Sequence, residues 1–184
     1  MDINRLTEKA QEALQTAQSD ALRRSNQQVD VEHLVAALLA QEGGLAASIL
    51  KRTGANVEAL KTLLDQELDR VPKVNGPSGA PDQIYVTQRL NKLFTKAEDE
   101  AKRIKDDFIS VEHFLLAAAD DSKVFQELGI TRDRIMQALR EVRGNQRVTS
   151  KNPEATYEAL EKYGRDLTQA AAAGKLDPVI TTTH

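Results

Sequence analysis

The sequence predicts an all-α fold in which two homologous four-helix repeats pack in a pseudo-twofold fashion, followed by a linker and a C-terminal helix. Three observations predict it. Apolar residues recur at spacings of three and four, which places them on one face of a helix. Only 4% of the 184 residues are aromatic, so aliphatic residues and alanine must supply most of the core. The tripeptide Val-Glu-His occurs twice, 80 positions apart.

The first helix is predicted from an apolar stripe that runs from Leu6 to Ala21. Asp30 then offers the side-chain oxygen of an N-cap, so a second helix is expected to begin directly after it. The pair Gly43 and Gly44 is expected to end this helix, because glycine readily adopts the left-handed backbone found at helix C-termini.

A short third helix is expected over about residues 45–52, with Gly54 near its end. Asn56 is expected to cap a fourth helix that continues to Leu68. Residues 71–85 contain three prolines and two glycines, which is typical of a connector. The first half of the chain therefore predicts one unit of four short helices.

The helical pattern then restarts. At a constant offset of 80, Thr7 aligns with Thr87 and residues 31–33 align with residues 111–113. Beyond Ala37 the offset falls to 75, so one turn of the second copy is five residues shorter. Such a duplication predicts two similar units that bury faces against each other. The expected parts are a first repeat (1–75), a connector (76–85), a second repeat (86–144), a linker and helix (145–180, the helix at 155–173) and an added tail (181–184).

Composition and missing motifs argue against several classes of function. The net charge of −3 mixes both signs along the chain, so we expect no nucleic-acid partner and no membrane partner. The chain has no cysteine and no apolar run near the roughly 20 residues of a membrane-spanning helix, so a cytoplasmic location is expected. Because it has no GxxxxGK[ST], GxGxxG or GxSxG motif, the sequence shows no active site.

The repeated Glu-His pair has two interpretations. In the first, His33 and His113 are catalytic or bind a metal, as in a small hydrolase or metalloprotein. Neighbouring helical residues point about 100° apart, however, so Glu32 and His33 cannot grip one metal ion together. A zinc site also needs three or four ligands, and only two histidines precede the terminal His184. We therefore expect no metal site.

In the second interpretation, which we favour, the pair marks the start of the second helix of each repeat. Asp30 and Ser110 would be N-caps. Glu32 and Glu112 would lie in the first turn, where a carboxylate gains about 0.3–1 kcal/mol from the helix dipole. The adjacent histidine would pack sideways or bond a nearby carbonyl group. This interpretation explains the motif without a catalytic or metal-binding role.

Longer segments resemble a known family. They are LTEKAQEALQTAQSDA, VDVEHLVAALLAQEGG, ELDRVPKV, ISVEHF, VRGNQRVTSKNPEATYEALEKYGRDLT and GKLDPVI. Together they cover essentially residues 3–180 and resemble the N-terminal region of the ClpB family of protein-disaggregating chaperones. The resemblance implies a mobile, non-enzymatic domain that engages unfolded or aggregated polypeptide before a hexameric ring threads it. The ATPase modules of the family, which bind ATP and magnesium, are expected to lie outside this chain.

The resemblance also implies partners. The full-length protein is expected to be a homohexamer that works with the DnaK chaperone system, whereas this chain alone is expected to be a monomer without cofactors. The alternative is a structural or adaptor-docking domain that regulates the ring without touching clients.

By motif position, the resemblance assigns client contact to three polar residues and a neighbouring apolar groove. The polar residues are Thr7, Asp106 and Glu112. The candidate groove residues are Leu90, Leu93, Phe94 and Phe108. Leu93 and Phe94 fit an ordinary core as well. A shallow groove with a carboxylate rim would bind weakly and favour basic segments that expose apolar residues.

Overall fold

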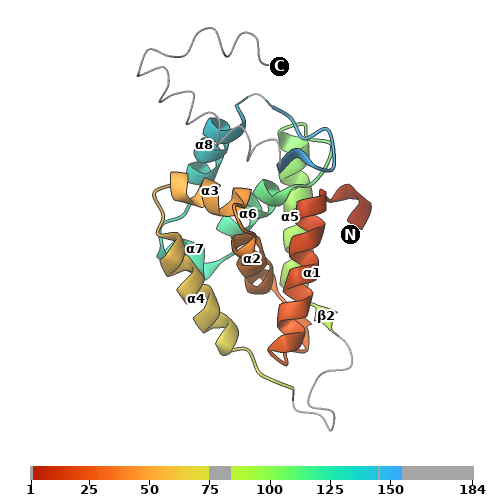
Figure 1. The fold of residues 1–184 in the computed structure, drawn as a ribbon, viewed down its shortest axis with the longest axis vertical. Helices are drawn as coiled ribbons and strands as arrows, with labels where there is room; N and C mark the ends of the chain where they lie inside the picture. Colours follow the sequence, from red (N-terminus) through yellow and green to blue (C-terminus); the bar gives the residue numbers. More distant parts are fainter. Residues whose placement is uncertain (1, 75–83, 145, 155–184) are drawn as a thin grey trace.

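The computed structural model describes residues 2–74, 84–144 and 146–154, in which eight α-helices form two sets of four (Figure 1). The first set is α1 (Glu8–Arg23), α2 (Val31–Ala40), α3 (Leu45–Arg52) and α4 (Val57–Asp69). The second set is α5 (Gln88–Arg103), α6 (Val111–Ala119), α7 (Lys123–Glu127) and α8 (Arg132–Arg143). The minor elements are a 3-10 helix, η1 (Ile3–Arg5), and two strands, β1 (Gln28–Val29) and β2 (Tyr85–Val86).

The two sets of helices reproduce the offsets in the sequence. Helices α5 and α6 begin 80 residues after α1 and α2, and α8 begins 75 residues after α4. The shortening falls around α7, which has five residues where α3 has eight. The predicted all-α fold of two four-helix repeats is confirmed.

Contacts between the two sets are reciprocal, as an approximate twofold relation requires. Helix α2 contacts α6, α3 contacts α8, and α4 contacts α7. The backbone pairings follow the same relation. Leu6 pairs with Ile109 and Val29 pairs with Val86, and Val86 and Ile109 are the positions 80 residues after Leu6 and Val29. The parallel strands β1 and β2 are not predicted from the sequence, because two residues are too few to show an alternating pattern.

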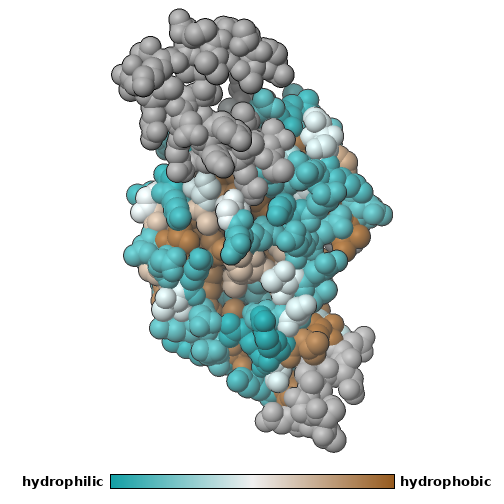
Figure 2. Space-filling model, viewed as in Figure 1, coloured by the Kyte–Doolittle hydropathy of each residue, from teal (hydrophilic) through white to brown (hydrophobic). Residues whose placement is uncertain are grey.

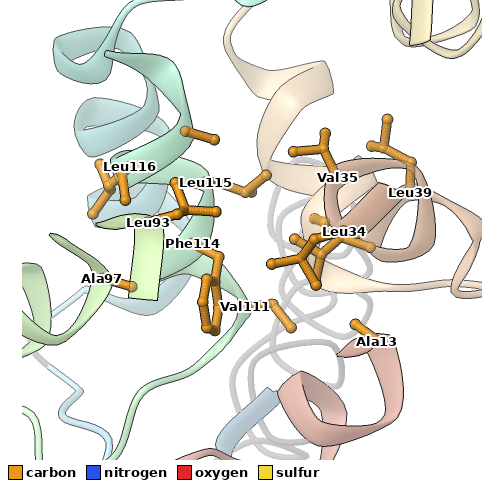
Figure 3. Close-up of a cluster of buried hydrophobic side chains, with 14 of the residues drawn as sticks. Ala13, Leu34, Val35, Leu39, Leu93, Ala97, Val111, Phe114, Leu115 and Leu116 are labelled. Atoms are coloured by element: carbon orange, nitrogen blue, oxygen red, sulfur yellow. The ribbon is translucent and has the colours of Figure 1, made fainter. Parts of the chain in front are cut away.

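Helix α6 lies in the middle of the core. All nine of its residues are buried, so it is packed on every side and not along a single stripe. Figure 3 shows Leu34 and Val35 of α2 on one side of this core and Phe114 and Leu115 of α6 on the other. The fully buried positions of α1 are all alanine, which lets α1 approach α2 closely: Ala10, Ala13, Ala17 and Ala21.

The end of α2 differs from the prediction. The helix ends at Ala40, and Gly43 and Gly44 belong to the turn that follows. The Gly44 N–H donates to the Gln41 carbonyl oxygen at 3.0 Å, and a Cβ atom on Gly44 would lie 2.8 Å from that oxygen. Glycine is therefore required by this tight turn, and Gly44 is the N-cap of α3 instead of the end of α2.

Other expectations concern the helix starts and the C-terminal part. Asp30 caps α2, and Asn56 caps α4 by accepting the Ala59 N–H at 3.0 Å, as predicted. The helix expected over residues 155–173 lies outside the described residues, and the proposed domain boundaries stay predictions. Within the described ranges, no single helix is long and apolar enough to cross a membrane.

Candidate functional site

The three polar residues that the family resemblance assigns to client contact come together where α6 begins. Thr7 caps α1, Asp106 lies between α5 and α6, and Glu112 is in the first turn of α6. All three are buried. We call them, together with the residues that bind them, the polar cluster: Thr7, Asp106, Glu112, His113, Arg143 and Glu154.

Asp106 is held by three hydrogen-bonding partners. Its Oδ2 lies 2.8 Å from His113 Nε2, and its Oδ1 accepts hydrogen bonds from Arg143 Nη2 at 2.5 Å and from the Val148 N–H at 2.8 Å. Burial opposes ionisation, but the hydrogen bonds from His113 and Arg143 outweigh it and lower the pKa of Asp106 to about 2. Asp106 is therefore a buried carboxylate at neutral pH.

Glu112 shares Arg143 with Asp106. Its Oε2 accepts a hydrogen bond from Arg143 Nη1 at 3.2 Å, and its Oε1 accepts one from the Ser110 hydroxyl. Arg143 is itself only 6% exposed. One buried guanidinium group thus pairs with two buried carboxylates, which fixes the end of α8 against the start of α6.

Glu154 completes the polar cluster from the far end of the described chain. Its Oε2 accepts hydrogen bonds from the Thr7 hydroxyl at 2.5 Å and the Val111 N–H at 3.2 Å. Its Oε1 is buried without a hydrogen-bond partner among the described residues. Burial, reinforced by the nearby carboxylate of Glu112, raises the pKa of Glu154 to about 7.

Sequence reasoning missed Arg143 and Glu154. Both lie in the segment VRGNQRVTSKNPE, where the sequence predicts only a helix end and a flexible linker. Glu154 meets Thr7 across 147 positions of sequence, a separation at which no local spacing carries a signal. Both residues lie in one of the segments that resemble the ClpB family, but the resemblance assigns neither of them a role.

The raised pKa of Glu154 predicts a pH-dependent stability. Between its ordinary value near 4.5 and its folded value of about 7, the folded chain holds a proton that the unfolded chain releases. We therefore expect the free energy of unfolding to fall by up to about 3 kcal/mol as the pH rises from about 4.5 to 7. Urea denaturation of the wild type and of Glu154→Gln across this range measures it.

The difference between the two profiles isolates Glu154. Burial lowers the pKa of His33, so below pH 6.5 that residue makes stability rise with pH, the opposite sign. The contribution of His33 is the same in the wild type and in Glu154→Gln, so it cancels when one profile is subtracted from the other. Parallel profiles for the wild type and Glu154→Gln would show that the proton is not taken up at Glu154.

The other copy of the motif forms a twin cluster at the start of α2. Its residues are Asn26, Asp30, Glu32, His33, Thr87 and Arg89. His33 Nδ1 accepts the Asp30 N–H at 3.0 Å, and Nε2 lies 2.9 Å from Asn26 Oδ1. Glu32 accepts two hydrogen bonds from Arg89, at 2.9 and 3.1 Å. The twin cluster thus has neutral Asn26 where the polar cluster has charged Asp106.

Both Glu-His pairs are structural elements of helix starts. Asp30 and Ser110 are N-caps, as predicted, and the histidine closes a capping box in each copy. His113 Nδ1 accepts the Ser110 N–H at 2.8 Å, so both ring nitrogens of each histidine are engaged. In the part of the chain that the structure describes, no three acidic, His or Cys side chains are placed to hold a metal ion.

The four apolar candidates lie in different environments. Leu90 and Leu93 are 0% and 1% exposed, and Figure 3 shows Leu93 among the core side chains near Phe114. Phe94 is 6% exposed, and its ring meets that of Phe114 edge-on, with centroids 5.8 Å apart and planes at 81°. Phe108 is half-buried against the core. Leu90, Leu93 and Phe94 are therefore core residues, and of the four only Phe108 is half-buried.

Phe94 lines a small hollow between η1 and α5. The hollow has a volume of about 280 Å³, and its other lining residues are Asp2, Arg5, Asn91, Thr95, Glu98 and Ile109. Ile109 connects it to the polar cluster, because its carbonyl accepts the Thr7 N–H at 2.9 Å and its N–H donates to the Arg5 carbonyl at 2.8 Å. A hollow that is lined mainly by polar side chains, with Phe94 as its aromatic member, lies beside the buried polar residues.

A second hollow, of about 890 Å³, lies between the end of α5 and α8. Its lining is strongly basic: Arg103, Arg132, Arg140, Arg143 and Arg147, with Asp133 as the acidic member. Asp106 and Glu112 do not form the exposed carboxylate rim that the sequence suggested, because both are buried and paired with Arg143. Of the arginines in this lining, Arg103 and Arg132 pair with Glu100, and Arg143 pairs with Asp106 and Glu112.

The face in Figure 2 is mostly hydrophilic, with apolar surface beside β2. There Tyr85 is 48% and Val86 is 36% exposed. Single exposed apolar residues of this kind are normal on soluble proteins and do not mark a binding site by themselves.

Comparisons with known proteins give consistent similarities. The Clp repeat (R) N-terminal domain model matches residues 5–129. The chain is 47% identical to the chaperone protein ClpB of Nitratidesulfovibrio vulgaris, over 98% of this chain and 22% of that protein. The Hsp104 N-terminal domain from Candida albicans is similar with a TM-score of 0.70 and 26% identity, over 81% of this chain and 98% of that one.

A ClpV N-domain solved in complex with a VipB peptide has the same fold, with a TM-score of 0.64 and 20% identity, over 75% of this chain and 86% of that one. The chain spans about a fifth of the length of the curated relatives it matches.

Proposed function

Since this chain belongs to the Clp repeat (R) N-terminal domain family, we propose that it binds unfolded or aggregated polypeptide for a ClpB-type, ATP-dependent disaggregase. Its own role in this proposal is binding, not catalysis. ATP and magnesium would be bound by ATPase modules elsewhere in a longer protein. That protein would be a cytoplasmic homohexamer, supplied with clients by the DnaK chaperone system.

The hollow beside Phe94 is the observation that carries the proposal. The exposed edge of the Phe94 ring and polar groups from η1 and α5 line it together, so an apolar side chain of a client can meet both. The Thr7–Asp106–Glu112 cluster lies next to it through Ile109. A site this small contacts only one or two side chains, so its binding has little sequence specificity. This suits clients that share only exposed apolar residues.

Binding at one such site is expected to be weak. Six copies on a ring would raise the effective concentration of sites around a bound client. Several weak contacts together would then hold the client, although each contact alone is weak. This arrangement also lets each contact release quickly while the client is threaded.

The test is residue-resolved mapping of a client. An isotope-labelled chain is titrated with reduced, carboxymethylated lactalbumin at high micromolar concentration, and we expect chemical-shift changes around Phe94, Asn91 and Thr95. Thr95→Trp, which fills the hollow, should weaken binding about tenfold, whereas Lys96→Trp, an exposed neighbour outside the hollow, should not. Unchanged spectra at saturating client would refute the proposal.

The second candidate is docking of one defined adaptor peptide, without client contact. The observation in its favour is the ClpV N-domain, which has this fold and was solved with a bound peptide. Under this alternative the unfolded client leaves the spectrum unchanged. Thr95→Trp would then also leave disaggregation by the longer protein intact.

A further inference from the structure

Residues 146–154, which we call the return segment, run from the end of α8 back across the molecule. In Figure 1 this blue stretch lies beside the ends of α1 and α5. Residues 146–152 form neither helix nor strand, the chain enters a helix at Pro153, and the backbone is bonded to the rest of the domain. The Val148 carbonyl accepts the Asp107 N–H at 2.7 Å, and the Lys151 carbonyl accepts the Glu8 N–H at 2.7 Å.

The return segment is buried at two places. Val148 is buried near its start, and Pro153 and Glu154 are buried at its end, whereas residues 149–152 between them are exposed. A peptide bound by main-chain hydrogen bonds and a few side-chain pockets shows a similar division. The pocket of Glu154 is made by Thr7 and by the Val111 N–H, and the N–H of Val148 is bonded by Asp106.

The docked state also carries an unfavourable contact. The Glu154 carboxyl group is buried near the carboxylate of Glu112, and its Oε1 lacks a hydrogen-bond partner among the described residues. A short segment with three buried side chains and one unsatisfied buried oxygen is expected to belong to the less stable parts of the fold. It is therefore placed to exchange with another peptide.

We propose that the return segment is a cis-bound occupant of a peptide groove over Thr7, Asp106 and Glu112, and that a client segment takes its place. This rests on the proposed function and adds a second client contact beside the hollow at Phe94. The client segment places an aliphatic side chain where Val148 lies and a carboxyl group where that of Glu154 lies. The donors that it would meet are the Thr7 hydroxyl and the N–H groups of Glu8, Asp107 and Val111.

The return segment supplies partners for buried polar groups. Client contact through Thr7 and Asp106 requires that something bond them when no client is present, because buried polar groups without partners are costly. In the unoccupied domain Glu154 accepts the Thr7 hydroxyl and the Val111 N–H, and the Val148 N–H donates to Asp106. Glu112 is bonded by Arg143 and Ser110 and not by the return segment. Displacement then exchanges one set of hydrogen bonds for an equivalent set, so the net affinity for a client is low.

The test compares two double-alanine variants of the whole chain. The anchor variant, Val148→Ala with Glu154→Ala, truncates two of the three buried side chains of the segment, and the control variant, Thr149→Ala with Asn152→Ala, changes only exposed residues. Hydrogen exchange at the Glu8 and Asp107 amides reports whether the segment is released. Client affinity is measured by titration with reduced, carboxymethylated lactalbumin.

We expect the anchor variant to exchange these amides faster and to bind the client about tenfold more tightly, the gain for a segment that is docked about 90% of the time. The control variant should match the wild type. Faster exchange with unchanged or weaker client binding would overturn the inference while the proposed function stands. If neither the wild type nor the anchor variant binds the client, the proposed function fails as well.

Discussion

Replacing Arg143 with methionine is expected to lower the free energy of unfolding by about 3–5 kcal/mol. The guanidinium group of Arg143 lies 2.5 Å from Asp106 and 3.2 Å from Glu112, and all three side chains are buried. Methionine keeps much of the apolar stem but removes the charge, so two buried carboxylates lose the cation that they share. Urea denaturation at pH 7 measures the loss without adding salt.

The matched control is Arg140→Met, at an exposed position on the same helix, where the change is expected to stay within about 0.5 kcal/mol. Adding Asp106→Asn to the Arg143→Met variant should recover part of the stability, because it removes one unpaired buried charge. Equal losses for Arg143→Met and Arg140→Met would show that the two carboxylates do not depend on Arg143.

Replacing Phe114 with alanine is expected to cost about 3–5 kcal/mol, and to shift the whole unfolding transition. Phe114 is 1% exposed in the central helix α6, and its ring packs edge-on against Phe94. The substitution removes the buried ring and leaves a cavity that its neighbours can fill only in part. Because α6 contacts α2, α3, α5, α7 and α8, the loss is shared by both repeats.

Calorimetry of Phe114→Ala tests both the size and the cooperativity of this effect. Leu22→Ala is the control, since Leu22 is 45% exposed and its truncation should change stability by less than about 0.5 kcal/mol. One transition at a lower temperature is expected. Two separate transitions, with only the second repeat affected, would contradict a core shared by the repeats.

The order and the lengths of the helices could be predicted because their signals are local. Helix starts at Asp30 and Asn56 depend on a side chain three residues or fewer from its backbone partner. The turn after Ala40 was mispredicted, since two adjacent glycines can end one helix or begin the next. That choice depends on the close approach of Gly44 to Gln41, which the sequence does not show.

The role of the two histidines could be predicted only in part from the sequence. The sequence predicts that the Glu-His pairs begin two equivalent helices, but not that His33 and His113 close the capping boxes. Glutamate or glutamine usually fills that third position. A histidine does so here because its second ring nitrogen finds Asn26 in one copy and Asp106 in the other, partners seven residues away on the preceding loop.

The sequence by itself determined the duplication, the all-α class and the absence of recognised catalytic motifs, because periodicity, caps and repeat offsets are properties of neighbouring residues. Only the tertiary structure decided that Thr7, Asp106 and Glu112 are buried, that Arg143 neutralises two of them and that Glu154 covers the third. Burial and long-range pairing depend on the path of the chain, which brings residue 154 to residue 7 across 147 positions of sequence.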